Sequence, residues 1–339
     1  MSLTLELLQF IGSPFAQTTI QLSREKAPEL HRLAARNRMS FFCLEKIGQN
    51  GKLNDLYDLY TKEKTKCFKT LDSIARVSKL LANSNIDHAV YKTLRPYEST
   101  TVDIDILVFG DRGSFKKAVR TMLEAGYELV VRGPRSTTLR DTELDMGIDL
   151  YEQIAVSYVT YMDKRRLVDY LTITKLPNGS QVKTLKAEAD LACIIAHSVI
   201  KEHMYTLSEY YTFIYYVKQL DVERFLRIAT RNNLTSAVRT HASITAMLHM
   251  AAHRTTPNKL QQILDRFGQD YLETARLIEN DLHTPHKYHP ITIVESIVEI
   301  LKAKETRNSI SEQLVHMLDP KISRDFLKRL IDHIFRETY

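Results

Sequence analysis

The sequence predicts an α+β protein in which a turn-rich region of strands and helices is flanked by N-terminal helices and by a large helical C-terminal region. Glycine supplies the positive φ angles of tight turns. Six of the ten glycines lie in the middle of the chain: Gly110, Gly113, Gly126, Gly133, Gly147 and Gly179. On both sides, apolar residues recur at spacings of three and four, which is typical of amphipathic helices. We therefore expect three regions, residues 1–85, 86–185 and 186–339.

The N-terminal region is predicted to contain helices over residues 2–10, 23–47 and 53–81. A break between Gly48 and Gly51 separates the last two. The third helix has apolar positions at Leu56, Leu59, Leu71, Ile74, Val77 and Leu81. From about Thr70 onward, we expect it to pack directly on the sheet.

The middle region is predicted to fold into short strands and one helix. The helix spans residues 114–125 and has Ser114 as its N-cap. Strands are expected over residues 127–132, 136–140 and 144–151. A hairpin with an Asn178-Gly179 turn follows and closes the region at about residue 185.

One strand of this region carries two closely spaced carboxylates. In the run from Val102 to Val108, β-branched residues favour a strand, and its period of two places Asp103 and Asp105 on one face. Ile104 and Ile106 then point into a core. Two adjacent carboxylates repel each other unless a cation or hydrogen-bond donors lie between them. Mg²⁺ is the natural candidate, because it is usually held by one or two carboxylates together with substrate phosphates. The alternative is an edge strand whose polar face happens to be acidic.

The surrounding sequence resembles the nucleotidyltransferase superfamily, which has the DNA polymerase β-like fold with a mixed sheet. In that signature a strand and a small-residue turn lead to a second strand that carries Asp-x-Asp. Here the strand ends at Val90-Tyr91-Lys92-Thr93, and the second strand reads Asp103-Ile104-Asp105-Ile106-Leu107-Val108. The branch that it resembles most is uncharacterised and reads roughly Leu-Lys-Gly and then Asp-Ile-Asp-Leu-Leu-Val.

The turn between the two strands departs from this signature. The superfamily has Gly-Ser or Gly-Gly where this chain has Thr93-Leu94. Thr93 keeps a hydroxyl but lacks the conformational freedom of glycine. Either the turn approaches the triphosphate less closely, or the positive charges of Lys92 and Arg95 compensate. The resemblance implies that Lys92, Thr93 and Arg95 bind the nucleotide.

The resemblance also implies a third carboxylate on a neighbouring strand. Asp149 is the favoured candidate, because Ile148 and Leu150 flank it as core residues and Asp-Leu-Tyr resembles the Asp-Leu-His of this branch. Asp145 has the same parity along the strand and is the second candidate. The alternative is that the third carboxylate is only a solvated hairpin residue.

A helix over residues 188–202 corresponds to one that follows the hairpin in the resembled branch. His197 lies in its middle and could line a pocket for the acceptor or the base. Lys201 and Tyr210 could join it, because aromatic and basic side chains together stack and hold RNA bases. Packing of His197 between domains and of the tyrosines in the core is the alternative.

The remainder of the chain reads as helices with breaks near Asn232, Pro257, residues 284–290 and Asp319-Pro320. His283, His286 and His289 have a spacing suited to a transition metal, but the neighbouring prolines favour a simple connector. The three cysteines, Cys43, Cys67 and Cys193, are unevenly spaced and predict buried thiols rather than disulfides or a zinc site.

Composition and charge limit the location and the partners. The formal net charge is +6 and the isoelectric point is about 9.0, which favours an anionic partner such as nucleic acid. No apolar run approaches the roughly 20 residues of a membrane span, and no signal peptide pattern is evident. We therefore expect a cytoplasmic protein that does not enter a membrane.

The resemblance implies transfer of NMP from an NTP to an acceptor hydroxyl, with release of pyrophosphate. Asp103, Asp105 and Asp149 would hold two Mg²⁺ ions, or Mn²⁺ in their place. Charge favours an RNA 3′ end as the acceptor, such as that of tRNA, as in toxin-type members of the superfamily. A small-molecule or protein acceptor and a non-catalytic RNA-binding or antitoxin-like module are the alternatives.

Overall fold

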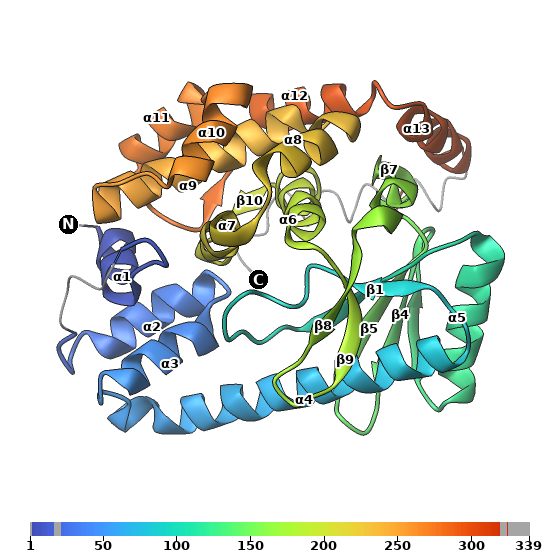
Figure 1. Cartoon of the computed structure of the whole chain (residues 1–339), viewed down its shortest axis with the longest axis horizontal. Helices are drawn as coiled ribbons and strands as arrows, with labels where there is room; N and C mark the ends of the chain where they lie inside the picture. Colours follow the sequence, from blue (N-terminus) through green and yellow to red (C-terminus); the bar gives the residue numbers. More distant parts are fainter. Residues whose placement is uncertain (1, 17–21, 319–323, 325–339) are drawn as a thin grey trace.

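A seven-stranded mixed sheet forms one half of the molecule (Figure 1). The structure is a computed structural model, which describes residues 2–16, 22–318 and 324. Across the sheet the strand order is β3-β4-β5-β2-β1-β9-β8. Its strands are β1 (His88–Val90), β2 (Asp103–Val108), β3 (Glu128–Arg132), β4 (Ser136–Asp141), β5 (Met146–Tyr151), β8 (Leu171–Lys175) and β9 (Gln181–Leu185). The predicted strands and the hairpin are thus present, and the α+β fold class is confirmed.

The direction of the strands makes the centre of the sheet mixed. β2 pairs antiparallel with β1 and parallel with β5. β1 in turn pairs parallel with β9, whereas β3, β4 and β5 form an antiparallel meander. β2 is therefore an inner strand, and its polar positions lie within the sheet rather than at an edge.

Two helices cover one face of the sheet. α4 (Tyr57–Asn83) runs along the base of the molecule and packs against β1 and β9, as predicted, while α5 (Arg112–Glu124) packs against β2 (Figure 1). Ile104 and Ile106 are fully buried in the core between this face and the helices. The predicted N-cap of α5 is wrong: Asp111 caps it, accepting a hydrogen bond from the backbone N–H of Ser114. Aspartate is as good an N-cap as serine, and here it lies at the position where the chain enters the helix.

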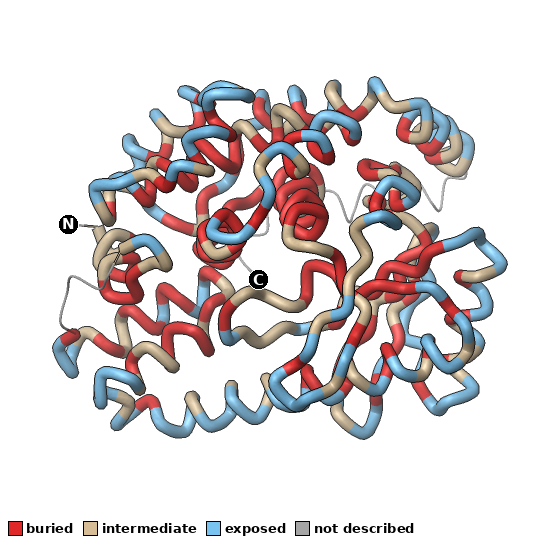
Figure 2. Tube along the Cα trace, viewed as in Figure 1, coloured by how far each residue is buried: buried red, intermediate tan, exposed pale blue. Residues whose placement is uncertain are grey.

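The N-terminal helices are α1 (Leu3–Ile11), α2 (Ala27–Arg36) and α3 (Ser40–Gln49). The single helix predicted over residues 23–47 is wrong, because the chain turns between α2 and α3. Arg38 adopts a positive φ of 59° there, a conformation that an α-helix excludes. Their buried residues belong to one hydrophobic core with those of the C-terminal helices, and Figure 2 draws the buried segments in red.

The C-terminal region packs its helices above the other face of the sheet (Figure 1). They are α6 (Ala187–Ala196), the π-helical η3 (His197–Glu202), α7 (Leu207–Gln219), α8 (Val222–Arg231), α9 (Thr235–His253), α10 (Asn258–Phe267), α11 (Tyr271–Glu279), α12 (Pro290–Ile300) and α13 (Lys304–His316). The break predicted at Asp319-Pro320 lies outside the described residues. Among those that are described, no helix is long and apolar enough to cross a membrane.

Short elements connect these parts. A two-stranded sheet of β6 (Ile154–Val156) and β7 (Val159–Met162) follows the meander, and the short helix η2 (Lys164–Tyr170) leads into the hairpin. A second small sheet pairs β10 (Met204–Tyr205) with β11 (His286–Lys287). The short helix η1 (Asn54–Leu56) precedes α4.

Candidate active site

Three aspartates meet on the face of the sheet that looks toward the C-terminal helices. Asp105 of β2 is directly opposite Asp149 of β5, and Asp103 lies two residues before Asp105 on the same face. Leu107, the next residue on that face, packs into the core of the helical region. We call Asp103, Asp105 and Asp149 the aspartate cluster. The alternation of β2 predicted the shared face of Asp103 and Asp105, and the resemblance, together with the flanking core residues, implied Asp149 as the third carboxylate.

The aspartate cluster is electrostatically costly. Burial raises the pKa of Asp103 to about 6, and the charges of Asp105 and Asp149 add to the rise. Burial also raises the pKa of Asp149, against a hydrogen bond of 2.5 Å from the Thr138 hydroxyl. Carboxylates that raise one another's pKa in a half-buried place favour a cation beside them.

Lys92 provides positive charge within this cluster. Its Nζ lies 3.4 Å from Oδ1 of Asp105, and its side chain is only 5% exposed. The ammonium group also lies 4.7 Å and 5.0 Å from the ring centres of Tyr91 and Tyr151, within the range of cation–π attraction. The sequence predicted a basic residue near the phosphates, but not its contact with an aspartate.

The turn after β1 is built around Lys92 rather than Thr93. Lys92 has a positive φ of 59°, the region that glycine usually occupies, and its backbone N–H donates to Oδ1 of Asp190 at 2.7 Å. Thr93 is not among the residues with positive φ, so its β-branched side chain fits there without strain. Its hydroxyl accepts a hydrogen bond of 2.8 Å from the backbone N–H of Asp105. Thr93 therefore ties the turn to β2.

His197 continues the polar contacts away from the sheet. Its Nδ1 lies 3.3 Å from the Lys92 ammonium, and its Nε2 lies 3.2 Å from Glu202. Burial and the charges of Lys92 and Lys201 lower the pKa of His197 to about 3, so the neutral ring accepts from Lys92 and donates to Glu202. Glu202 also accepts from Arg38 of the N-terminal region at 3.2 Å.

Asp190 is a site neighbour that the sequence analysis did not identify. It is buried at the start of α6, where it accepts from the Lys92 backbone and from the Tyr216 hydroxyl at 2.8 Å. The acidic start of this helix was a signal for it. Tyr151, whose hydroxyl donates to Asp149 at 3.4 Å, is a second such neighbour.

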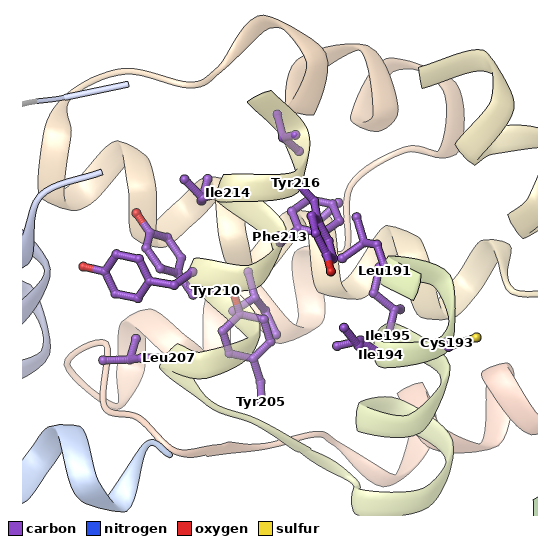
Figure 3. Close-up of a cluster of buried hydrophobic side chains, with 14 of the residues drawn as sticks. Leu191, Cys193, Ile194, Ile195, Tyr205, Leu207, Tyr210, Phe213, Ile214 and Tyr216 are labelled. Atoms are coloured by element: carbon purple, nitrogen blue, oxygen red, sulfur yellow. The ribbon is translucent and has the colours of Figure 1, made fainter. Parts of the chain in front are cut away.

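Three other predicted residues lie in different surroundings. Arg95 is directed into the helical region, where it donates to Thr212 at 3.2 Å and pairs with Glu209 at 3.9 Å. Lys201 of η3 is close enough for its charge to oppose the rise in pKa of Asp103 and Asp149. Tyr210 is fully buried in the helical core (Figure 3) and cannot stack on a base. His197 and Lys201 thus lie beside the aspartate cluster, whereas Tyr210 lies in the core.

The remaining candidates lie away from the aspartate cluster. Asp145 is exposed in the turn before β5, where it pairs with Arg140. His286 is buried against Glu273 at 2.8 Å, and His289 caps α12, so these two histidines hold a connector together. Cys43 and Cys193 are buried free thiols, as predicted, and Cys67 is half-buried.

The donors of the aspartate cluster fit a magnesium ion that is shared with a substrate. Carboxylate oxygens are the ligands that Mg²⁺ prefers, and it commonly takes only one or two of them beside phosphate oxygens and water. Over the described ranges, no three His, Cys, Asp or Glu side chains surround a single point closely enough to hold a metal. The cluster is therefore suited to an ion that arrives with a nucleotide, rather than to an all-protein cage.

Comparison with known proteins finds similarity only among solved structures. No protein-family model and no curated protein matches the sequence. An antigenic nucleotidyltransferase-like protein from Paracoccidioides brasiliensis is 13% identical, with 68% of this chain and 97% of that chain covered and a TM-score of 0.31. The STING-associated c-di-GMP synthase CdnE from Capnocytophaga granulosa is 12% identical, with 87% and 100% covered and a TM-score of 0.33. The Thermotoga maritima CCA-adding enzyme, solved with tRNA, is 11% identical, with 74% and 83% covered and a TM-score of 0.23.

The class of fold follows from the sheet itself. β1 and β2 are antiparallel, β5 lies parallel beside β2, and the Asp-x-Asp pair and the third aspartate face the same side. The resemblance implied the Asp-x-Asp strand and a third carboxylate on a neighbouring strand, and the structure adds the directions in which these strands pair. The sheet is therefore consistent with an α+β nucleotidyltransferase fold, and substrates and acceptors are argued from the site.

Proposed function

We propose that the protein is a metal-dependent nucleotidyltransferase that uses the aspartate cluster. An acceptor hydroxyl oxygen bonds to the α-phosphorus of an NTP, the bond from that phosphorus to the bridging oxygen breaks, and pyrophosphate leaves. The hydroxyl proton passes to solvent, and NMP remains on the acceptor. One observation carries the proposal: three aspartates on adjacent strands share one half-buried face, where burial and then the charges of Asp105 and Asp149 raise the pKa of Asp103.

Each residue of the site has a role in this proposal. Asp103, Asp105 and Asp149 would hold magnesium together with substrate phosphates and water, as two ions if the resemblance holds, and manganese could replace it. When bound, magnesium neutralises phosphate charge and lowers the pKa of the attacking hydroxyl. Lys92 pairs with the triphosphate once the nucleotide is present, and Thr93 fixes the turn against β2 through the Asp105 backbone.

The proposed acceptor is the 3′ end of an RNA, and tRNA is the first one to test. The formal net charge of +6 supports an anionic acceptor, because electrostatic attraction raises the rate of encounter with nucleic acid. Lys201 adds positive charge beside the aspartate cluster. Modification of tRNA ends would stop translation, so expression of the active protein is expected to inhibit growth.

Radiolabel transfer tests this proposal. Purified protein is incubated with Mg²⁺, total tRNA and each α-labelled NTP in turn, beside a reaction without RNA. The Asp103→Ala, Asp105→Ala double variant is run in parallel. If label appears on the RNA with the natural protein but not with the double variant, the proposal is supported and the preferred nucleotide is identified.

Other outcomes separate the alternatives. Label on the protein would indicate transfer to a side chain, and label released in a small product without RNA would indicate a small-molecule acceptor. No transfer with any NTP, from folded protein, would contradict the enzymatic proposal and leave a non-catalytic RNA-binding or antitoxin-like module.

A further inference from the structure

The Lys92 ammonium is a positioned charge rather than a mobile surface charge. Asp105, His197 and the rings of Tyr91 and Tyr151 surround it within 3.3 to 5.0 Å. A buried lysine with this many partners has already lost most of its side-chain conformational entropy on folding. Without a ligand, its position is therefore held by these contacts.

The backbone of Lys92 also costs conformational energy. A non-glycine residue with φ of 59° is unfavourable and persists only where its surroundings hold it. Here Asp190 holds the backbone N–H, while His197, fixed by Glu202, accepts from the side chain. Arg38 fixes Glu202 in turn. Strain that is supported from both sides in this way is typical of functional sites.

We propose that Lys92 is a built-in counter-cation of the aspartate cluster, and that a divalent cation binds Asp105 only as the Lys92 ammonium leaves it. The inference rests on the proposed function, because it concerns the metal that nucleotidyl transfer would use. Lys92 and the divalent cation are then competing ligands of one carboxylate, and the site changes from a lysine-neutralised form to a metal-bound form.

Charge and position give the reason for this exchange. The ammonium lies 3.4 Å from Oδ1 of Asp105, and a divalent cation on the same carboxylate would lie close to a like charge in a half-buried environment, where repulsion is weakly screened. A nucleoside triphosphate gives the displaced ammonium a new anionic partner. Metal and nucleotide therefore favour each other's binding, and metal alone binds weakly.

Mn²⁺ binding to the full chain without nucleotide tests the inference, followed by electron paramagnetic resonance of the free ion. Lys92→Met removes the charge at similar volume, and we expect it to tighten Mn²⁺ binding by about tenfold, since a contacting like charge is lost. Lys92→Gln, which can still donate to Asp105 and His197, is the second neutral variant and is expected to do the same if Lys92→Met does not fold.

Lys201→Met is the matched control, because it removes the same charge near the aspartate cluster from a different position. It is expected to tighten binding by about threefold or less, since the charge of Lys201 acts on Asp103 more weakly than that of Lys92. In an Asp105→Asn background, Lys92→Met should no longer change Mn²⁺ affinity. Folding of each variant is checked by urea denaturation.

The possible results are distinct. Unchanged or weaker Mn²⁺ binding in both folded Lys92 variants, or equal tightening by Lys201→Met, overturns the inference, as does an absence of Mn²⁺ binding in every variant. Tighter binding in the Lys92 variants without any labelled product from the natural protein supports the inference and removes the proposed function. Labelled product from the natural protein, with no effect of the Lys92 variants on Mn²⁺ affinity, supports the proposed function and overturns the inference.

Discussion

Two sites in this protein hold acidic side chains away from bulk solvent, but they differ in how the negative charge is compensated. Glu273 of α11 is fully buried and faces donors: His286 at 2.8 Å, the backbone N–H of His289 at 2.5 Å, and Arg276 at 3.1 Å. Burial alone would raise its pKa, but the bonds from His286 and His289 lower it.

The aspartate cluster has the opposite balance. Burial, and then the charges of Asp105 and Asp149, raise the pKa of Asp103 to about 6. A carboxylate whose donors complete its hydrogen bonds stabilises the native fold, whereas carboxylates that repel one another cost stability and persist where a ligand uses them. The comparison therefore separates a structural acidic site from the one for which we propose a function, and four predictions test it.

The largest effect is expected at Asp105. Asp105→Asn removes the central charge of the cluster, and we expect labelled transfer to fall by at least about a thousandfold, because the carboxylate would hold the catalytic metal. The free energy of unfolding should change little, because the lost contact with Lys92 is offset by the relief of repulsion between Asp105 and the other two aspartates. Asp87→Asn is the control, because Asp87 is exposed and pairs with Lys183. Loss of transfer in Asp87→Asn, or full activity in Asp105→Asn, would contradict the assignment.

The next largest effect is expected at Glu273. Glu273→Gln leaves His286 and Arg276 without their charged partner, so we expect a loss of about 3 kcal/mol in the free energy of unfolding. Transfer per folded molecule should stay the same. Urea denaturation measures the first and labelled transfer the second. Glu295→Gln is the control, because this exposed partner of Arg239 should contribute less than about 1 kcal/mol. Equal stability of the two variants would break the comparison.

The strand that carries the aspartate cluster could be predicted from the sequence because its pattern is local. A period of two fixes the shared face of Asp103 and Asp105, and flanking core residues fix that of Asp149. The hairpin followed from its Asn-Gly turn. Such features depend on neighbours in the chain, so no tertiary information is needed.

Other features depend on contacts between distant segments. Lys92 meets His197, 105 residues further on, only because α6 and η3 pack over the sheet. The burial of Tyr210 follows from the packing of α7 among the other C-terminal helices, and the turn at Arg38 from the way α2 and α3 pack together. Tertiary packing overrides local pattern at these positions.

A third prediction concerns a buried polar side chain of the helical region that, unlike Glu273, has no hydrogen-bond partner for its ring among the described residues. His241 is fully buried, and none of the described residues makes a hydrogen bond to its ring nitrogens. Burial lowers its pKa to about 3, so below pH 6.5 the unfolded chain binds a proton that the folded chain does not. Stability is therefore lost as the pH falls.

His241→Phe removes that loss. We compare the free energy of unfolding of the variant with that of the natural protein at each pH. This difference should favour the variant by about 2 kcal/mol more at pH 5 than at pH 7.5, the value expected for a histidine that has its ordinary pKa in the unfolded chain. Urea denaturation at the two pH values measures it. If this difference does not change with pH, His241 has the same pKa in the folded and unfolded chains. The conclusion that its ring is buried without a hydrogen-bond partner would then be wrong.

The smallest effect is expected in the stability of the site itself. The folded pKa of Asp103, about 6, exceeds its ordinary value of 3.8, so the folded chain binds more protons than the unfolded chain between these values. Stability therefore falls as the pH rises through this window. Without divalent cations, Asp103→Asn should stabilise the protein by about 1 kcal/mol at pH 8, after allowance for partial exposure, and by almost nothing at pH 4. Urea denaturation at both pH values measures the difference. Destabilisation at pH 8 would mean that Asp103 is compensated like Glu273, and the contrast between the two acidic sites would then be lost.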